Sequence, residues 1–255
     1  MKARTAALGA VTVALVVSAV GCGPSDDAKD GKDAKPAPSG GTSHTASTAP
    51  DPAASGSAAP TSSGKVLTRA QLAGVALTTG EVRGYDVTPM QGGDETGTER
   101  SESAACRPLV AVINGAPEPA PAATVFRTVM DKSEEGEDDQ TVVTEILTSH
   151  RQDGAQQLMR GVRDAVRACA GGFRTSSPDG PSTYTEVKQL ALPGAGQESV
   201  AYQVTGSIEG EKVPLVFQLV RTGSTVVTFY VANFLEPTTP KLPAELVAAQ
   251  AAKLP

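Results

Sequence analysis

Residues 23–64 constrain the fold more than any other part of the chain, because they contain nothing that could build a hydrophobic core. The stretch uses only Gly, Pro, Ser, Thr, Ala, Asp, Lys and a single histidine, His44. Such a segment cannot bury enough apolar surface to offset the ~1 to 2 kcal/mol per residue that backbone ordering costs. We therefore predict that 22–64 is a disordered tether carrying a solvated His44, and that residues 65–255 form a single folded domain.

The N-terminus ahead of this tether has the pattern of a bacterial export signal. Lys2 and Arg4 supply positive charge, and an uncharged apolar run follows from Ala6 to Val20. This run is roughly 15 residues long, shorter than the ~20 residues that a membrane-spanning helix needs. We predict that residues 1–21 are a signal peptide that is removed on export.

Cys22 lies at the predicted cleavage point. The sequence Ser18-Ala19-Val20-Gly21-Cys22 resembles the bacterial lipobox, in which the cysteine receives a lipid and becomes the new N-terminus, although Ala19 stands where the lipobox favours Leu. We expect Cys22 to carry acyl chains such as palmitate, which anchor the domain to the outer face of the cell membrane. The alternative is ordinary secretory cleavage near Gly21, which leaves Cys22 as a spare thiol.

The charge and aromatic content of the chain argue against nucleic acid as a partner. The formal net charge is -6, there is no Trp, and aromatic residues make up 4% of the chain. Phosphate backbones require a basic surface, and single strands require stacking platforms. We expect the partners to be the membrane, through the lipid, and an envelope ligand or protein that the sequence does not identify.

Cys106 and Cys169 are the two cysteines of the domain. Outside the membrane, a pair of thiols in one domain is most simply a disulfide, and we expect these two to be joined. Cys169 ends a strongly amphipathic helix from Asp153, with a capping-box-like start formed by Asp153 and Gln156.

The remaining patterns predict an α+β domain. A capping box at Thr68 and Gln71 opens a helix that ends near Gly80, and further helices are expected at 106–114 and 244–253. Segments rich in branched or aromatic residues predict strands at 85–90, 124–130, 141–148, 183–190, 199–208, 211–220 and 224–234. Short turns between the last three strands indicate antiparallel pairing, so we expect one antiparallel sheet with helices packed mainly on one face.

A resemblance covers most of the domain. The helix at 67–77 with its following Gly84-Tyr85 strand, the Cys106 helix, the helix ending at Cys169 and the closing strands with a terminal helix look like extracytoplasmic lipoproteins of actinobacteria. The same elements are similar to the extracellular sensor domain of PknH-like receptor kinases. The resemblance implies a binding or sensing module without a catalytic centre, stapled by disulfides. This chain has cysteines for one bridge where two are expected in the kinase sensor.

Candidate catalytic and metal-binding residues give little support for an enzyme, and we predict no catalytic residue, no metal and no cofactor. Ser149 and His150 could contribute to a hydrolase site, but no nucleophile elbow, zinc motif or phosphate loop is present. An acidic run fails as a calcium loop because Val142 stands where the bidentate glutamate belongs. This run, which we interpret as a charged hairpin loop, comprises Asp131, Glu134, Glu135, Glu137, Asp138 and Asp139. Arg160, Arg163 and Arg167 form a row that we interpret as a solvated helix face, partly neutralised by Asp164.

These observations lead to one principal hypothesis and two alternatives. The principal hypothesis is a lipid-anchored, non-enzymatic module that binds an envelope ligand or protein. The first alternative is a carrier that shields acylated lipids in a cavity between sheet and helices, motivated by the apolar residues on both faces of 213–220. The second alternative is a hydrolase that uses Ser149 or His150 in a pocket with a nearby acid.

Overall fold

The structure is a computed structural model that describes residues 64–91, 96–133, 141–208, 210–233 and 238–255. Contacts divide the chain into Met1–Ser55 and Gly56–Pro255, and every described residue belongs to the second unit. The predicted signal peptide, Cys22 and His44 lie outside the described residues.

Four α-helices and a short 3₁₀ turn are present in the described part of the chain. The helices agree with the predicted segments, although the first ends earlier than Gly80. Their bounds are α1 Arg69–Val75, η1 Ala104–Cys106, α2 Arg107–Ile113, α4 Gly154–Ala168 and α5 Ala244–Lys253. The predicted capping box at the start of α1 is confirmed, because Thr68 Oγ1 accepts from Gln71 N and Gln71 Oε1 accepts from Thr68 N.

The strands include all seven predicted ones and two that were not predicted. Their bounds are β1 Tyr85–Pro89, β2 Arg100–Ser101, β3 Ala123–Asp131, β4 Val142–Ser149, β5 Phe173–Ser176, β6 Ser182–Gln189, β7 Glu198–Ile208, β8 Glu211–Thr222 and β9 Thr225–Ala232. They form one nine-stranded sheet in the order β1-β3-β4-β9-β8-β7-β6-β5-β2. All neighbouring strands in this order are antiparallel, which confirms the predicted α+β class with an antiparallel sheet.

The turn between β8 and β9 shows how the sequence sets the register of the central strands. Thr222 pairs with Thr225, so the loop consists of Gly223 and Ser224 alone. Gly223 has a φ of 56°, the left-handed backbone conformation that a two-residue hairpin with glycine first requires. The turn therefore fixes β8 against β9, and β9 in turn pairs with β4 at the middle of the sheet.

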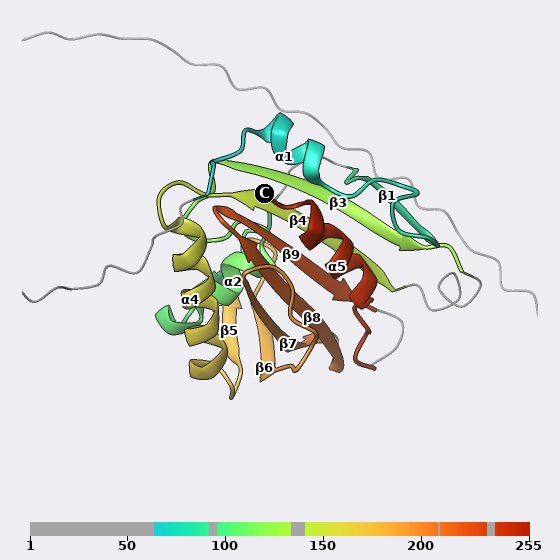
Figure 1. Cartoon of the computed structure of the whole chain (residues 1–255). Helices are drawn as coiled ribbons and strands as arrows, with labels where there is room; N and C mark the ends of the chain where they lie inside the picture. The colour runs from blue at the N-terminus through green and yellow to red at the C-terminus, as the bar shows by residue number, and fades with distance from the viewer. Residues whose placement is uncertain (1–63, 92–95, 134–140, 209, 234–237) are drawn as a thin grey trace, which may run out of the picture. The chain divides into compact units, whose positions relative to one another are not determined.

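Helices cover both faces of this sheet rather than mainly one. Along β8, Leu215 and Phe217 belong to a core shared with α2 and α4, whereas Val216 and Val220 belong to a second core shared with α1 and α5. Figure 1 shows α1 running over β3 and α5 over the strands at the middle of the sheet. The sequence led us to expect helices mainly on one face. Both faces of β8 and β9 are apolar, so burial of each face requires helices on both sides of the sheet.

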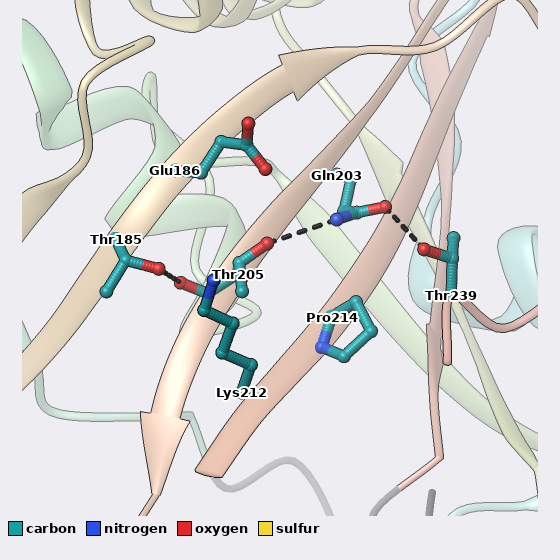
Figure 2. A pocket seen from close by; sticks show the side chains of 7 residues that line it. All are labelled: Thr185, Glu186, Gln203, Thr205, Lys212, Pro214 and Thr239. Carbon is teal, nitrogen blue, oxygen red and sulfur yellow. Dashed lines mark hydrogen bonds between the residues drawn. The ribbon is translucent and has the colours of Figure 1, made fainter. Parts of the chain in front are cut away.

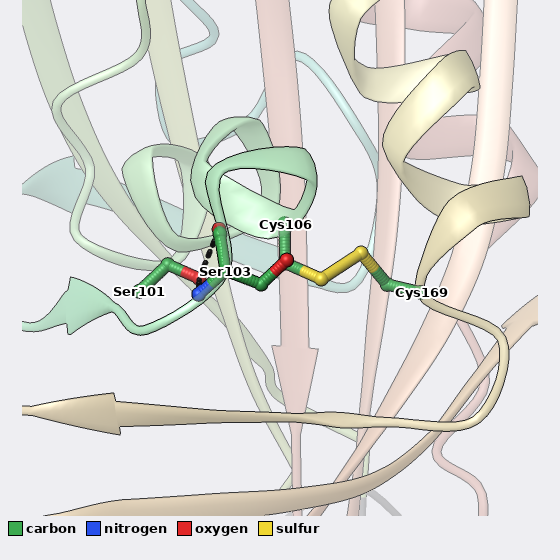
Figure 3. The surroundings of a disulfide bond; sticks show 4 residues. All are labelled: Ser101, Ser103, Cys106 and Cys169. Atoms are coloured by element: carbon green, nitrogen blue, oxygen red, sulfur yellow. Dashed lines mark hydrogen bonds between the residues drawn. A yellow bond between two sulfur atoms is a disulfide. The ribbon is translucent and has the colours of Figure 1, made fainter.

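A disulfide closes the core on the α4 side of the sheet (Figure 3). Cys106 and Cys169 are joined with a Cα–Cα distance of 5.9 Å, as the sequence predicts. Both cysteines are buried, and the bond links the turn before α2 to the residue that ends α4. The two helices that pack against each other on this face are therefore also covalently connected.

The start of α4 differs from its prediction. Asp153 occupies the N-cap position but makes no side-chain capping bond. Its carboxylate instead accepts from Gln157 Nε2 at 2.6 Å, one turn into the helix. The predicted pairing of Asp153 with Gln156 is therefore wrong, because the side chain turns along the helix surface instead of toward the backbone amides.

Candidate functional site

A polar pocket of about 360 Å³ opens on the face of the sheet formed by β6, β7 and β8 (Figure 2). We call it the sheet-face pocket. It is lined by Thr185, Glu186, Gln203, Thr205, Lys212, Pro214 and Thr239.

The alternation of side chains along β7 explains why polar residues gather in this pocket. Val200, Tyr202 and Val204 point into the core beneath α4. The intervening residues Gln203 and Thr205 therefore point to the opposite face of the sheet. On that face α1 and α5 contact β3, β4 and β9, away from the lining strands.

Hydrogen bonds hold Gln203 in a fixed orientation within the pocket. Gln203 Nε2 donates to Thr205 Oγ1 at 3.1 Å, and Thr239 Oγ1 donates to Gln203 Oε1 at 2.9 Å. Figure 2 shows this chain of contacts running from β7 to Thr239. Because an amide group has two N–H donors and a carbonyl with two lone pairs, Gln203 keeps the capacity to bind a further polar group.

A second pocket of about 410 Å³ shares Thr239 with the sheet-face pocket. The segment 238–243, which we call the strap, supplies Thr239 to both pockets and leads directly into α5. We call this second site the strap pocket. It is lined by Tyr85, Asp131, Ser133, Thr141, Val143, Asn233, Thr238, Thr239, Pro240, Lys241 and Pro243.

Polar side chains of the strap pocket are held by neighbouring groups. Tyr85 Oη donates to Glu245 Oε1 at 3.2 Å, and burial, together with the charges of Glu245 and Asp131, raises the pKa of Tyr85 to about 12. Tyr85 therefore stays a neutral hydroxyl at physiological pH. Asp131 Oδ1 accepts from Ser133 N at 2.8 Å. The pocket offers hydroxyls, an amide, one acidic and one basic side chain, a set that suits a small hydrogen-bonding ligand.

The space between α4 and the sheet, where the carrier alternative needs a lipid-sized cavity, is occupied by side chains. Tyr202, Phe217 and Tyr230 stack in a row, with ring centroids 5.1 and 5.0 Å apart. Leu158 and Met159 of α4 are buried in the same core. This packing gives no support to an acyl-chain site at that position.

Ser149 and His150 are both buried, but they do not form a serine–histidine pair. Ser149 Oγ accepts from Leu67 N at 2.8 Å, which ties the start of the domain to the end of β4. His150 Nε2 contacts Thr148 Oγ1 at 3.0 Å, and burial lowers the pKa of His150 to about 4. Their hydrogen bonds give both residues structural roles.

The arginine row of α4 is paired with acidic side chains rather than arranged as an anion site. Arg163 forms an ion pair with Glu198, and Arg167 with Asp164, while Arg160 lies 3.9 Å from Asp153. The predicted neutralisation by Asp164 thus falls on Arg167, its neighbour one turn later. Of the acidic run, Asp131 contributes to the strap pocket, and the other members at 134, 135, 137, 138 and 139 lie outside the described residues.

Sequence reasoning missed one buried acid. Glu145 lies in the middle of β4, between Arg127 of β3 and Phe229 of β9, and its side chain is 0% exposed. Neither carboxyl oxygen has a hydrogen-bond partner among the described residues. A glutamate inside an otherwise apolar and threonine-rich strand is the signal that could have identified it.

Comparison with known proteins identifies a solved structure with a similar fold. The structure is similar to the extracellular domain of PknH from Mycobacterium tuberculosis, with a TM-score of 0.50 and 11% sequence identity, over 74% of this chain and 97% of that domain. At this identity the likeness concerns the fold, and it confirms the PknH-like architecture that the resemblance predicted. No protein-family model matches the chain, and no curated protein matches it in sequence.

No helix in the described ranges combines the length and apolar character needed to cross a bilayer.

Proposed function

We propose that this chain is a lipid-anchored, sensor-like binding module of the bacterial envelope, non-enzymatic and displayed outside the cytoplasm. The observation that carries the proposal is the shared fold with an extracellular domain of PknH, together with two polar pockets that share Thr239 of the strap. The N-terminal pattern around Cys22 supports the anchoring part.

The pockets favour a small polar ligand over an acyl chain. Both are lined mainly by hydroxyl, amide and charged groups. Acidic and basic side chains occur together: Glu186 with Lys212 in the sheet-face pocket, and Asp131 with Lys241 in the strap pocket. A ligand rich in hydroxyl and amide groups, without strong net charge, matches this lining.

Titration of the purified full chain in detergent tests the binding site. Muramyl dipeptide serves as a hydroxyl- and amide-bearing envelope fragment, and palmitate as the acyl probe, with calorimetry and backbone amide shifts as readouts. We expect the dipeptide to shift amides of β7 and the strap, and palmitate to leave them unchanged. Gln203→Leu should weaken binding of the dipeptide about fivefold, as expected for the loss of one hydrogen bond of ~1 kcal/mol. Glu211→Gln, at the exposed first residue of β8, should leave the affinity unchanged.

The opposite pattern contradicts the proposal. Binding of palmitate with shifts in the core beneath α4 would favour the carrier alternative. Equal affinities of the Gln203→Leu and wild-type chains for the dipeptide would remove the sheet-face pocket as its site.

A further inference from the structure

Glu145 is a titratable group that the proposed binding function does not use. It alternates along β4 with residues of the other face, and its same-face neighbours Val143 and Leu147 belong to the core shared with α1 and α5. Glu145 therefore points toward these two helices, in a setting with no exposed surface and no hydrogen-bond partner in the described chain.

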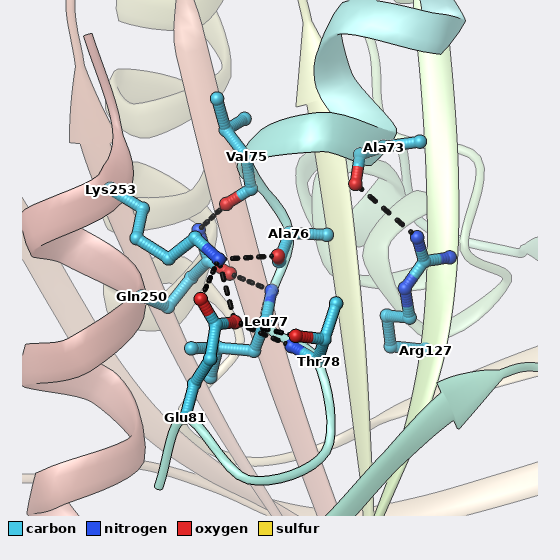
Figure 4. A network of polar contacts seen from close by, with 9 residues as sticks. All are labelled: Ala73, Val75, Ala76, Leu77, Thr78, Glu81, Arg127, Gln250 and Lys253. Atoms are coloured by element: carbon cyan, nitrogen blue, oxygen red, sulfur yellow. Dashed lines mark hydrogen bonds and ion pairs between the residues drawn. The ribbon is translucent and has the colours of Figure 1, made fainter.

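A set of polar contacts ties α5 to the segment 75–81 above this face (Figure 4). We call α5 and residues 75–81 the clasp. Gln250 Nε2 donates to Val75 O at 2.9 Å, and Gln250 Oε1 accepts from Leu77 N at 2.8 Å. Lys253 Nζ donates to Ala76 O at 2.9 Å and to both carboxyl oxygens of Glu81 at 2.6 Å. These contacts join the two halves of the clasp to each other.

Apolar side chains fix the clasp to the sheet. Leu77 and Leu246 are almost fully buried and share one core with Val143, Leu147 and Phe229. Separating the clasp from the sheet would therefore bring water to the strand face that carries Glu145.

The charges that face Glu145 do not bind it directly. Arg127 of β3 is its cross-strand neighbour, but this guanidinium donates to Phe126 O at 3.0 Å and lies 3.5 Å from Ala73 O. Lys253 of α5 and Glu81 of the 75–81 segment pair with each other, and β9 contributes the apolar Phe229. Burial raises the pKa of Glu145 to about 8, against the opposing effect of Arg127 and Lys253.

We propose that the clasp is a pH-controlled lid over Glu145, closed while this carboxyl holds its proton and increasingly open as the proton is lost. The closed form buries the neutral acid, and the open form lets water solvate the carboxylate. Because the strap ends where α5 begins, opening also moves one wall of the strap pocket.

The expected effect follows from proton linkage. In the closed form Glu145 ionises near pH 8, and in the open form near its ordinary value of 4.5. Between these two values the ratio of open to closed molecules rises tenfold for each pH unit, because the open form has lost a proton that the closed form keeps. From pH 5 to pH 7 the increase is about 70-fold, slightly less than two full decades because both ends of this range lie close to a pKa.

Amide hydrogen exchange of the full chain measures this ratio. Exchange rates are first divided by the intrinsic tenfold rise per pH unit. After this correction, exchange at Leu77 and at residues 247–251 of α5 should accelerate about 70-fold from pH 5 to pH 7. Amides of α4 on the other face should have larger opening free energies than those of the clasp at every pH, because α4 opens only with the whole domain, whose stability has the same pH dependence. In Glu145→Gln the excess should disappear, whereas Glu211→Gln, which changes an exposed glutamate, should retain it.

Three results would overturn the lid. They are the absence of any excess in the clasp, equal opening free energies in α4 and α5, and an excess that persists in Glu145→Gln. Equal opening free energies in both helices would mean that Glu145 meets water only in global unfolding. The comparison of α4 with α5 within the wild-type chain decides the question even if the Glu145→Gln chain fails to fold.

Discussion

Replacing Glu145 by Gln should remove the loss of stability that the wild-type domain undergoes as the pH rises to neutral. Glutamine keeps the shape and the polarity of the neutral acid but cannot ionise. In the wild-type chain, the folded state holds Glu145 protonated up to about pH 8, whereas the unfolded state loses that proton above 4.5. The wild-type free energy of unfolding therefore falls as the pH rises through this window, by about 1.4 kcal/mol per pH unit.

The size of the effect depends on how far the pH lies above the pKa of Glu145 in the unfolded state. At pH 7 the medium lies about 2.5 units above the unfolded pKa, so the ionisation term lowers wild-type stability by about 3 kcal/mol relative to pH 4. Glu145→Gln removes this term. From pH 4 to pH 7, the free energy of unfolding of Glu145→Gln should therefore fall by about 3 kcal/mol less than that of the wild type.

Urea denaturation at pH 4, 5, 6, 7 and 8, followed by circular dichroism with the disulfide intact, measures the difference. Subtracting the two curves cancels every other titrating group. Glu211→Gln provides the matched control, because it removes an exposed carboxyl and should run parallel to the wild type. A constant difference between Glu145→Gln and wild type from pH 4 to pH 8 would refute the reasoning, since it would mean that Glu145 titrates equally in both states.

Three further predictions address other parts of the domain. Replacing Cys106 and Cys169 together by Ala should lower the free energy of unfolding by about 4 kcal/mol, the chain-entropy value for a separation of 63 residues, and urea denaturation with and without reductant checks it. The pKa of His150 is lowered to about 4 by burial, so wild-type stability should fall as the pH drops from 6.5 toward 4, and His150→Asn should flatten that acid limb of the stability curve. Thr68→Ala removes the capping bond to Gln71 N and should cost about 1 kcal/mol, measurable as faster exchange of the first-turn amides of α1 at unchanged pH.

The strands and helices were largely predictable because they depend on local pattern. The branched and aromatic residues of 211–220 and the turn at Thr222-Gly223 lead directly to the observed β8–β9 hairpin. Helix α5 has the same first and last residues as the predicted segment 244–253. The strands β2 and β5 were missed because they are short. β2 pairs only with β5, far away in the sequence, although β5 also pairs with the nearby β6.

The distribution of helices over the sheet could not be decided from local pattern. The apolar residues on both faces of 213–220 suggested a lipid cavity as one explanation. The structure shows the simpler reason, because α4 covers one face and the clasp covers part of the other. Which helix covers which face depends on the sheet order, and the sheet order depends on long-range pairing of β4 with β9.

The candidate site was the least predictable part. Gln203 and Asn233 are separated along the chain, and they line neighbouring pockets only because Thr239 of the strap belongs to both. Ser149 and His150 attracted attention as adjacent nucleophile and base, but neighbouring residues of a strand end point to opposite faces and find separate partners. Two residues that are adjacent in an extended segment are therefore weak evidence for a shared catalytic site.

The proposed envelope location depends most on the N-terminus, because the predicted lipid on Cys22 would anchor the domain outside the cytoplasm. Intact-mass analysis of the membrane fraction tests it directly, with Cys22→Ala as the control. We predict a mature chain that begins at Cys22 and carries the added mass of a diacylglyceryl group, and a Cys22→Ala chain that lacks this mass. A full-length chain in the cytosol that retains residues 1–21 and carries no fatty acid would contradict the account.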